Sequence, residues 1–466
     1  MKIIQIIGVT AAILFSTSTL AAPVLDAAFN GNGKRNIWFD LPTEKWDEAT
    51  DAVLQPDGKI VIVGFARKAN YINLGDVRDL TVARLNADGS LDTSFATNGK
   101  LSMNLSTSGR RRDEANAVAL DSLGRIYVAG NSERATPNGV SFSAGFVLRL
   151  NANGTLDASY NKLQSWPYFE IAHQIRFEDI AIDLDGFAVM VGTIKKEIGE
   201  GNDGVVVRLR PDGVVDWFFD RGVVRLPGTS SLFFNDFHYQ YSRSDDQEIK
   251  RVAIAADGSI YAAGTTQVGS NDFDFVVYKL AENGFLVRNF GNSGIRKVSS
   301  YYGATYDRLA DIKLLPNGNL RLLGNCRISL PSGSVLRGCL VGLTAVGAVD
   351  STFNSFNATE VRTFPLNSEC NGIGGEARAL VLQSVVNSSV IVVGEQKPNT
   401  CLSTSQIAIS QHSNVAAQSF LNLPYSTNSS WANGAVMDAQ GRLLVVGATI
   451  LNAADTDQAS ARFTGF

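Results

Sequence analysis

The sequence predicts an all-β protein built from seven repeated four-stranded units, and three observations support this prediction. The 466 residues include 43 glycines but only 12 prolines, a composition typical of short strands joined by many tight turns. Apolar residues alternate with other residues in short runs, as expected for strands with two different faces. One phrase recurs along the chain: an alternating stretch, a turn such as Asp-Gly, and a second stretch that ends in glycine.

The repeated phrase is clearest in AVLQPDGKIVIVG, and its closing glycine recurs at intervals of 53 to 72 residues. The closing glycines are Gly64, Gly130, Gly192, Gly264, Gly324, Gly394 and Gly447. A second phrase, LTVARLNADGSLDTSF at residues 80–95, also recurs with decay. Each unit should therefore hold strands a and b around the first turn and strands c and d around the second. Strand d is expected to start at the LDxSF motif.

The two ends of the chain predict a closed ring. The last unit stops at SARFTGF, which matches a strand c phrase, whereas residues 25–34 match a strand d phrase without a unit of its own. Stacking such units around an axis buries the faces that one unit leaves open. The predicted fold is a seven-bladed β-propeller of four-stranded antiparallel blades, in which the N-terminal strand completes the last blade.

The phrases PDGKIVIVG and RLNADGSLDTSF resemble the delta-60 repeat family of bacterial exported proteins. The resemblance covers nearly all of residues 25–466, and it implies a β-propeller without a particular activity. The later units match less well. Gly342, for example, stands where other units have Arg84, Arg149, Arg208 and Arg462.

Residues 1–21 have the features of a secretory signal peptide. Lys2 precedes an apolar run from Ile3 to Phe15, and Thr19-x-Ala21 fits the cleavage rule. The alternative, a transmembrane anchor, needs about 20 apolar residues. We expect residues 22–466 to form one monomeric domain without a membrane span, secreted or in the periplasm of a Gram-negative bacterium. An outer-membrane protein ending at Phe466 ranks behind this interpretation.

Composition limits the function classes. A net charge of −4 excludes a broadly basic nucleic-acid binder. Three histidines and no CxxC pair give little support for zinc, and the GxSxG, HExxH and P-loop signatures are absent. We therefore expect a binding module that presents its b–c and d–a loops, predicted to be long, to a protein, glycan or small ligand. The alternative is an extracellular hydrolase or lyase with its site at the channel mouth.

Four cysteines in an exported chain favour disulfides. Three pairings are open, and the repeat selects one of them. Cys326 and Cys339 flank one b–c loop in the fifth unit, while Cys370 and Cys401 lie in two loops of the sixth. The expected pairs are Cys326–Cys339 and Cys370–Cys401, each contributing roughly 3–4 kcal/mol. The alternative is four unpaired buried thiols.

One repeat position supplies a candidate ligand site, which we call the mouth ring. It lies ten residues before the glycine of each a–b turn, at the start of strand a, where a propeller channel opens. Its members are Glu48, Glu114, Arg176, Glu248, Arg308, Glu376 and Trp431. Carboxylate oxygens make Ca²⁺ the candidate cation, with a polar ligand as another option, and no other cofactor is expected. The alternative is that these groups pair with one another or with neighbouring blades.

The aromatic insert at residues 230–250 is a second candidate ligand site. Phe237, His238, Tyr239 and Tyr241 are its chief candidate contacts, because exposed aromatic residues mark binding surfaces. The alternative is that its aromatic residues pack the insert onto the propeller.

A third set of charged residues recurs once per unit. It consists of Arg84, Arg149, Arg208, Lys279 and Arg462 with Asp26, Asp92, Asp157, Asp216 and Asp350. Residues that follow the repeat so regularly are expected to form structural ties rather than a site.

Overall fold

The computed structural model describes part of the chain. The described residues are 23–39, 45–71, 75–105, 112–135, 141–160, 174–195, 201–227, 234–235, 238–239, 246–269, 272–299, 306–330, 333–353, 361–364, 375–384, 389–396, 405–412, 419–423, 428–452 and 455–466. The signal-peptide prediction lies outside them. Apart from one short 3-10 helix, Asp220–Gly222, every regular element in this part of the chain is a strand. Within it, no helix has the length and hydropathy to cross a membrane.

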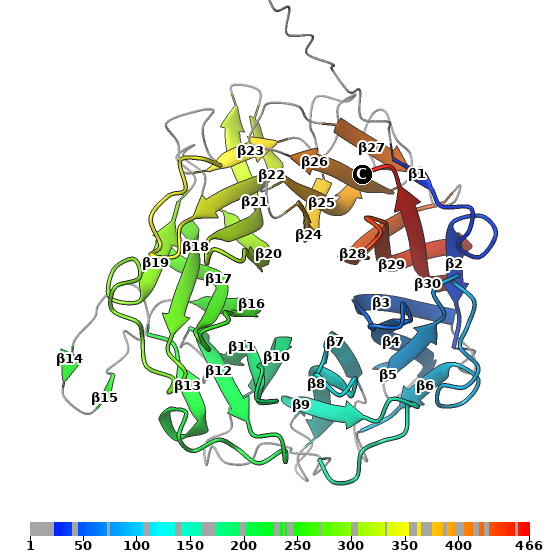
Figure 1. The fold of residues 1–466 in the computed structure, drawn as a ribbon, viewed down its shortest axis with the longest axis horizontal. Helices are drawn as coiled ribbons and strands as arrows, with labels where there is room; N and C mark the ends of the chain where they lie inside the picture. Colours follow the sequence, from blue (N-terminus) through cyan, green and yellow to red (C-terminus); the bar gives the residue numbers. More distant parts are fainter. Residues whose placement is uncertain are drawn as a thin grey trace, which may run out of the picture.

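Most strands form separate antiparallel sheets whose order in space follows the order in the chain (Figure 1). Four sheets hold four strands each. They are β10 (Gln174–Ile182), β11 (Ala188–Lys195), β12 (Asp203–Leu209) and β13 (Val223–Arg225); β16 (Gln247–Ile254), β17 (Ile260–Gly269), β18 (Asp272–Leu280) and β19 (Ile295–Val298); β20 (Asp307–Leu314), β21 (Leu320–Leu330), β22 (Gly333–Leu343) and β23 (Arg362–Phe364); and β24 (Gly375–Ser384), β25 (Ser389–Gln396), β26 (Gln406–His412) and β27 (Ser419–Leu423).

The remaining strands form smaller and larger sheets. A three-stranded sheet contains β7 (Asp113–Leu120), β8 (Ile126–Ala135) and β9 (Ser141–Leu150), and β14 (Phe234–Asn235) pairs with β15 (His238–Tyr239). A nine-stranded sheet contains β1 (Val24–Leu25), β2 (Lys34–Ile37), β3 (Lys45–Leu54), β4 (Ile60–Tyr71), β5 (Gly75–Leu85), β6 (Lys100–Met103), β28 (Ser430–Met437), β29 (Leu443–Asn452) and β30 (Asp455–Thr464).

The nine-stranded sheet brings both ends of the chain together. β2 pairs antiparallel with β30, from Lys34 opposite Ala461 to Ile37 opposite Gln458. β30 also meets β3, but only through a short parallel bridge at Lys45 and Trp46. The sheet therefore consists of two four-stranded groups, β28-β29-β30-β2 and β3-β4-β5-β6, with β1 beside β30. From here on each of these two groups is counted as a sheet of its own.

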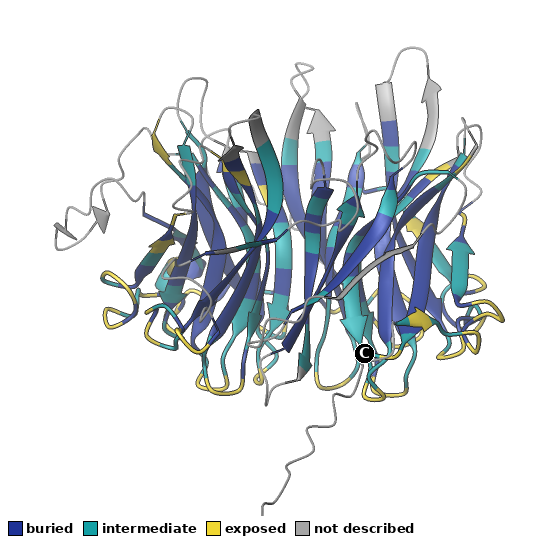
Figure 2. Cartoon of the chain, turned by 90° about the horizontal axis from the view of Figure 1, so that it is seen from above, coloured by how far each residue is buried: buried dark blue, intermediate teal, exposed yellow. Residues whose placement is uncertain are grey.

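The sheets are arranged around a common centre, and the first strand of each lies innermost (Figure 1). Each first strand contacts the first strand of the next sheet, and β28 in turn contacts β3. Apolar cores fill the spaces between neighbouring sheets; Val63 and Phe95, for example, pack with Val128 and Phe146 of the next sheet. Exposed turns gather on one face, which we call the turn face (Figure 2). The opposite face, where the first strands begin, is the loop face.

A β-bulge explains the recurring glycine. Each first strand shifts register directly after the residue opposite that glycine, as between Ala49 and Asp51 opposite Gly64. A Cβ atom on Gly64 would overlap the carbonyl oxygen of Glu48. Only glycine fits so close to a bulged backbone.

The b–c connections differ from the prediction in four sheets. In the fifth unit, for example, the β21–β22 ladder runs from Leu320 opposite Leu343 out to Leu330 opposite Gly333. The segment expected as a long loop between Cys326 and Cys339 is therefore mostly hairpin. β4–β5, β17–β18 and β29–β30 extend in the same way. The ladder continues because an extended chain can keep pairing until a turn interrupts it.

The LDxSF motif also differs from the prediction, because it forms a turn rather than the start of strand d. In the first unit, Asp92 Oδ1 accepts hydrogen bonds from the backbone N–H and the hydroxyl of Ser94, at 3.1 and 2.6 Å. Strand β6 begins only at Lys100. The Asp and Ser side chains stabilise a turn in preference to a strand.

Candidate functional site

The members of the mouth ring lie near the loop-face ends of the innermost strands. Glu48, Glu114, Glu248, Glu376 and Trp431 are among its members, and each stands directly before the residue that faces the recurring glycine. None of the seven side chains is fully buried. Their shared position therefore gives them a shared orientation relative to the bulge.

Two contacts within the mouth ring join neighbouring sheets. Glu48 Oε1 accepts hydrogen bonds from Trp431 Nε1 at 3.1 Å and from Asn433 Nδ2 at 2.8 Å. Arg308 Nη1 donates to Glu248 Oε2 at 3.2 Å. Sequence-distant residues of the ring are therefore brought together at the β28–β3 and β16–β20 boundaries.

Other ring members pair with charged residues outside it. Glu114 binds Arg78 at 2.6 Å, Glu376 binds Arg378 at 2.6 Å, and Arg176 lies 3.4 Å from Glu178. Of these three pairs, only Glu114 with Arg78 joins neighbouring sheets, as the alternative interpretation expects, because each of the other two pairs lies within one strand. Among the described residues, no group of three or more His, Cys, Asp or Glu side chains is placed to hold a metal ion. Binding of Ca²⁺ or of a polar ligand by the ring stays a prediction.

Two aromatic–guanidinium pairs, which sequence reasoning missed, lie beside the ring. The Trp46 ring lies 5.9 Å from the Arg67 guanidinium carbon, and the Tyr306 ring lies 5.4 Å from that of Arg327. Trp46 is 37% exposed and Tyr306 36% exposed. Both aromatic residues stand two positions before a ring member. A comparison of this position across the repeats would therefore have identified them from the sequence.

Each aromatic–guanidinium pair has a second aromatic ring from the preceding sheet. Trp431 lies 6.3 Å from Trp46, and Phe273 lies 6.3 Å from Tyr306. The Arg308 guanidinium sits 4.2 Å from the Phe273 ring and 4.7 Å from the Tyr306 ring. Aromatic faces and planar cations therefore share both sites.

A charged layer lies deeper along the innermost strands. Asp51, Asp179 and Asp311 occupy the same position in the first, third and fifth sheets around the centre. Each carboxylate accepts one N–H from its own strand and one from the next sheet, as Asp179 does from Ile180 and Val252, both at 2.9 Å. The same pattern links Asp51 to β7 and Asp311 to β24. These aspartates therefore tie alternate sheets to their neighbours.

Burial raises the pKa of two aspartates in this layer, Asp51 and Asp179, more than the nearby cations lower it. It raises the pKa of Asp179 to about 7, although the Arg251 charge opposes the shift, and it also raises the pKa of Asp51. Arg251 Nε lies 3.5 Å from Asp311, and Lys313 Nζ lies 2.9 Å from it. The layer therefore holds more carboxyl groups than cations.

The aromatic insert is only partly described. β14 and β15 form a short hairpin in which Asn235 pairs with His238 and Phe234 with Tyr239. Phe237 and Tyr241 lie outside the described residues, as do the side chains of His238 and Tyr239. Their roles stay predictions.

The predicted Cys326–Cys339 disulfide is confirmed. It crosslinks β21 and β22 across the extended hairpin, with the two Cα atoms 6.0 Å apart. Both cysteines are buried. Cys370 and Cys401 lie outside the described residues, so their pairing stays a prediction.

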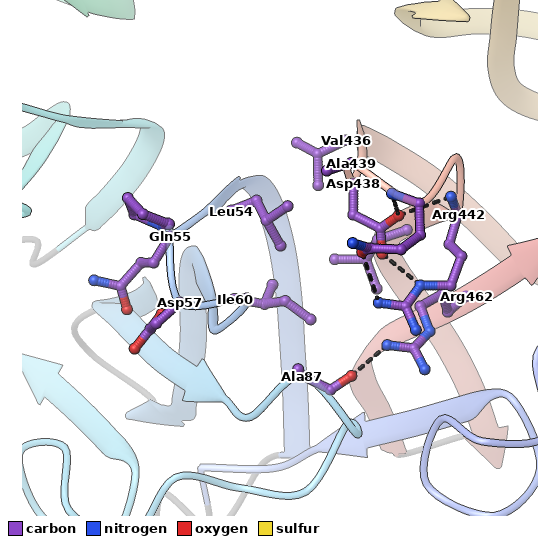
Figure 3. Close-up of a pocket in the computed structure, with 14 residues that line it drawn as sticks. Leu54, Gln55, Asp57, Ile60, Ala87, Val436, Asp438, Ala439, Arg442 and Arg462 are labelled. Atoms are coloured by element: carbon purple, nitrogen blue, oxygen red, sulfur yellow. Dashed lines mark hydrogen bonds and ion pairs between the residues drawn. The ribbon is translucent and has the colours of Figure 1, made fainter.

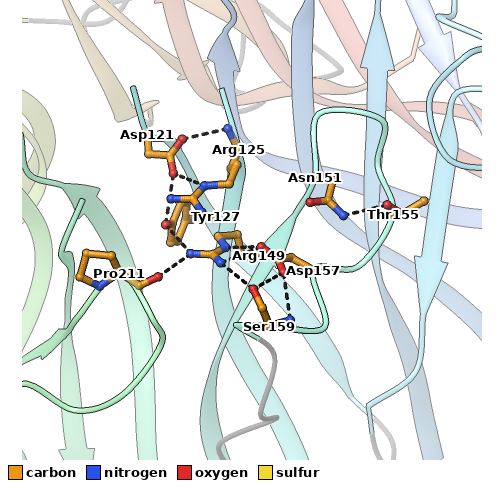
Figure 4. Close-up of polar contacts among 9 residues, drawn as sticks. All are labelled: Asp121, Arg125, Tyr127, Arg149, Asn151, Thr155, Asp157, Ser159 and Pro211. Atoms are coloured by element: carbon orange, nitrogen blue, oxygen red, sulfur yellow. Dashed lines mark hydrogen bonds and ion pairs between the residues drawn. The ribbon is translucent and has the colours of Figure 1, made fainter. Parts of the chain in front are cut away.

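The recurring Arg and Asp residues form structural ties, as predicted. Figure 4 shows one of them: Arg149 Nε donates to Asp157 at 2.7 Å, and Nη1 donates to the carbonyl oxygen of Pro211 in the next sheet at 2.7 Å. Comparable Arg–Asp pairs join Arg84 to Asp92, Arg208 to Asp216 and Arg462 to Asp26. Lys279 departs from the pattern and lies 5.0 Å from the Tyr261 ring.

A cavity of about 650 Å³ opens on the turn face. It lies between the β3–β4 and β28–β29 turns, as Figure 3 shows. Leu54 and Ile60 form one apolar wall, and Val436 forms part of the other. The rim carries Arg442, whose Nε donates to Asp438 at 2.5 Å. The side chains that line it come from the two ends of the chain, so single-strand patterns did not reveal it.

Comparisons with known proteins support a β-propeller. Residues 55–95 and 124–160 match the model of a family described as a domain of unknown function (DUF5122), beta-propeller. A comparison with curated protein sequences finds no significant match.

Several solved structures are similar to the chain. One is a protein of unknown function from Dyadobacter fermentans DSM 18053, with 11% identity over 92% of this chain and 99% of that one, and a TM-score of 0.45. A PL25 ulvan lyase has 9% identity over 91% and 95%, with a TM-score of 0.50. An alpha-L-arabinofuranosidase of Fusarium graminearum has 12% identity over 74% and 91%, with a TM-score of 0.43. At such identities the likeness concerns the fold alone.

Proposed function

We propose that the chain is a seven-bladed β-propeller of the delta-60 repeat type, closed by its own N-terminal strand. The β2–β30 pairing and the contact between β28 and β3 support closure. Seven copies of the bulge and its glycine support the number of blades. Arg462, near the C-terminus, binds Asp26 at 2.7 Å, which adds a side-chain tie across the same boundary.

Its proposed function is that of an exported binding module whose ligand sits on the loop face. The observation that carries this proposal is that polar and aromatic side chains gather on the loop face at positions where the residue type differs from one repeat to the next. The mouth ring mixes Glu, Arg and Trp at one structural position, and the two aromatic–guanidinium pairs lie beside it. Functional residues commonly sit at the connections of a rigid scaffold.

The disulfide supports an exported location. Disulfides persist in the periplasm and outside the cell, where thiols are not kept reduced. The Cys326–Cys339 bond therefore agrees with the predicted signal peptide. The proposed location is the periplasm or the cell exterior.

Hydroxyl-radical footprinting with a bacterial envelope extract tests this function. Bound material should lower the reactivity of Trp46 and Tyr306 on the loop face. Trp217 and Phe218, which are 60% and 89% exposed on the turn face, should keep their reactivity and serve as the internal control. Protection confined to the turn face, or no protection at all, would contradict the proposal.

The second candidate function is hydrolysis or lysis of an extracellular polymer at the same face. Its support is that a polysaccharide lyase and an arabinofuranosidase share the fold. Incubating the protein with ulvan and arabinan separates the two functions. Release of reducing or unsaturated sugars would favour the enzyme, whereas binding without release would favour the module.

A further inference from the structure

We propose that the two aromatic–guanidinium pairs are two subsites for one extended glycan chain that crosses the loop face. This inference rests on the proposed function, because it takes the loop face as the binding surface. It adds the chemical class of the ligand and the residues that contact it, Trp46 with Arg67 and Tyr306 with Arg327.

The two subsites are the same cross-strand pair used twice. Trp46 faces Arg67 in the β3–β4 ladder. Tyr306 stands directly before β20, and its carbonyl oxygen accepts the N–H of Arg327 in β21. A structural tie of the repeat would recur in every sheet, as the Arg–Asp ties nearly do. A pair that appears in only two of the described sheets is therefore better explained by a functional role than by a structural role in the repeat.

The other described sheets hold different residues at the aromatic position. They are Arg112, Gln174, Asp246 and Ser429. Arg112 there forms an ion pair with Glu133 at 3.6 Å, so that sheet uses the position for charge pairing. Within the described part of the chain, the aromatic choice is therefore specific to the β3 and β20 sheets.

Each subsite also lies at a boundary between two sheets and contains a ring carboxylate. Glu48 is held there by Trp431 and Asn433, and Glu248 is held by Arg308. Each carboxylate is therefore held by a group that contacts the aromatic residue of its subsite, since Trp431 lies 6.3 Å from Trp46 and Arg308 lies 4.7 Å from the Tyr306 ring. Fixing these polar groups in advance lowers the entropy lost when a ligand binds.

This combination of groups fits a sugar better than other ligands. An aromatic face can cover the apolar C–H face of a sugar ring. Carboxylate oxygens accept hydrogen bonds from hydroxyl groups, while guanidinium and amide N–H groups donate to them. A glycan satisfies both the apolar and the polar groups at each subsite.

The positions of the subsites call for a chain rather than a single sugar. In Figure 1 the β28–β3 and β16–β20 boundaries lie on opposite sides of the centre. One polymer that reaches both subsites gains affinity without a new contact, by a factor of about 10²–10⁴. A disaccharide can fill only one.

Affinity electrophoresis in native gels tests the proposal, with laminarin, xylan, alginate or polygalacturonate cast into the gel. At least one polymer should retard the wild-type protein. Trp46→Ala and Tyr306→Ala should each weaken binding to that polymer at least tenfold, and the double variant should lose it. A disaccharide of the same polymer should bind at least a hundredfold more weakly than the polymer, and Trp217→Ala on the turn face should bind like wild type.

Folding is controlled separately. Trp46→Phe and Tyr306→Phe keep an aromatic face and should keep most of the retardation. Loss of binding in the alanine variants counts only where their melting temperatures stay within a few degrees of wild type. If the alanine variants are unstable, Arg67→Gln and Arg327→Gln take their place in the same gels and should weaken the retardation.

Three results would overturn the glycan proposal. They are no retardation by any of the four polymers, full retardation of the double variant, and loss of retardation in Trp217→Ala. Periodate treatment of the envelope extract separates this failure from failure of the proposed function. If loop-face protection survives destruction of the glycans, a proline-rich or other peptide is the ligand and the binding module stands. If the extract never protects the loop face, the binding module itself fails.

Discussion

At the scale of single residues, the recurring glycines have a backbone reason that can be tested within one sheet. Gly130 faces the bulge of β7, where a Cβ atom would overlap the carbonyl oxygen of Glu114. Gly124, in the adjoining turn, has a φ of +72° but no heavy atom within 4 Å of a built Cβ. Gly130 therefore tests the lack of space for a Cβ atom, whereas Gly124 tests the preference of glycine for a positive φ.

We expect Gly130→Ala to lower the free energy of unfolding by about 3 kcal/mol or more, because the bulge must move. Gly124→Ala should lower it by only about 1 kcal/mol, the usual penalty for a left-handed backbone. Urea denaturation followed by tryptophan fluorescence gives both values. Equal losses would mean that the bulge relaxes easily and does not select glycine.

Asp179 predicts a pH dependence of stability. The pKa of its carboxyl group is about 7 in the folded protein against an ordinary 3.8. The folded chain therefore holds a proton that the unfolded chain releases between these values. The stabilisation is complete below pH 4 and is lost as the pH rises through 7.

We expect Asp179→Asn to reduce the fall in melting temperature between pH 4.5 and 8.5. The amide oxygen can still accept one of the two backbone N–H groups, so the variant should fold. Asp57→Asn, at a turn where the side chain is 59% exposed, is the matched control and should keep the wild-type profile. If wild type and Asp179→Asn show the same dependence of melting temperature on pH, Asp179 is not the cause of that dependence.

Some residues of the site could be predicted from the sequence and others could not. Cys326 and Cys339 were paired from their places around one hairpin, because that relation is local in the chain. The contacts of Glu48 with Trp431 and of Asp179 with Val252 join different sheets. Repeat position identifies such residues, but the neighbour that each one meets depends on how the sheets pack.

At the scale of an element, the fifth unit shows how one tie is kept after its usual residue is lost. Gly342 occupies the position where other units have arginine, and Arg321 lies opposite it on β21. Arg321 Nη2 binds Asp350 at 2.9 Å, and both side chains are buried. The guanidinium reaches the same aspartate from the neighbouring strand.

Arg321→Ala should therefore destabilise the protein by about 3–5 kcal/mol, because Asp350 is left buried without its partner. The double variant Arg321→Val with Gly342→Arg copies Val61 and Arg84 of the first sheet, which face each other in the same way. It should recover most of the loss in thermal unfolding. If stability is not recovered, moving the arginine from β21 to β22 requires further changes outside these two strands.

The disulfide supports a second prediction about the same hairpin. It closes a loop with a sequence separation of 13 residues. Cys326→Ser with Cys339→Ser should lower the free energy of unfolding by about 3 kcal/mol. Dithiothreitol should produce the same loss in the wild type and almost none in the variant. A wild-type protein insensitive to reduction would argue against any stabilising effect.

Element boundaries were harder to predict than element types. The alternation of apolar residues identified the strands, yet it did not show that β21 and β22 keep pairing out to Leu330. Likewise, the LDxSF motif looks like a strand start but folds as a turn around Asp92. In both places local hydrogen bonding decides the outcome, and hydrophobic periodicity does not report it.

At the scale of the whole molecule, the N-terminal segment covers an edge that would otherwise be open. Without β2, the backbone of β30 would expose unpaired N–H and C=O groups, a known route to aggregation. Asp26 also binds Arg462, whose guanidinium carbon lies 4.8 Å from the Phe29 ring. Residues 23–39 therefore contribute both backbone pairing and a buried side-chain tie to the last sheet.

A variant that begins at residue 40 should consequently melt at a lower temperature and self-associate in light scattering. The substitution Asp92→Ala breaks the equivalent Arg–Asp tie inside the first sheet and is the matched control. It should destabilise the protein without self-association, because no strand edge is exposed. A synthetic peptide of residues 23–39 should restore the truncated protein to a monomer with a higher melting temperature, since it can pair with β30 as β2 does. A truncated protein as stable and monomeric as the full chain would show that the ring does not depend on its N-terminal strand.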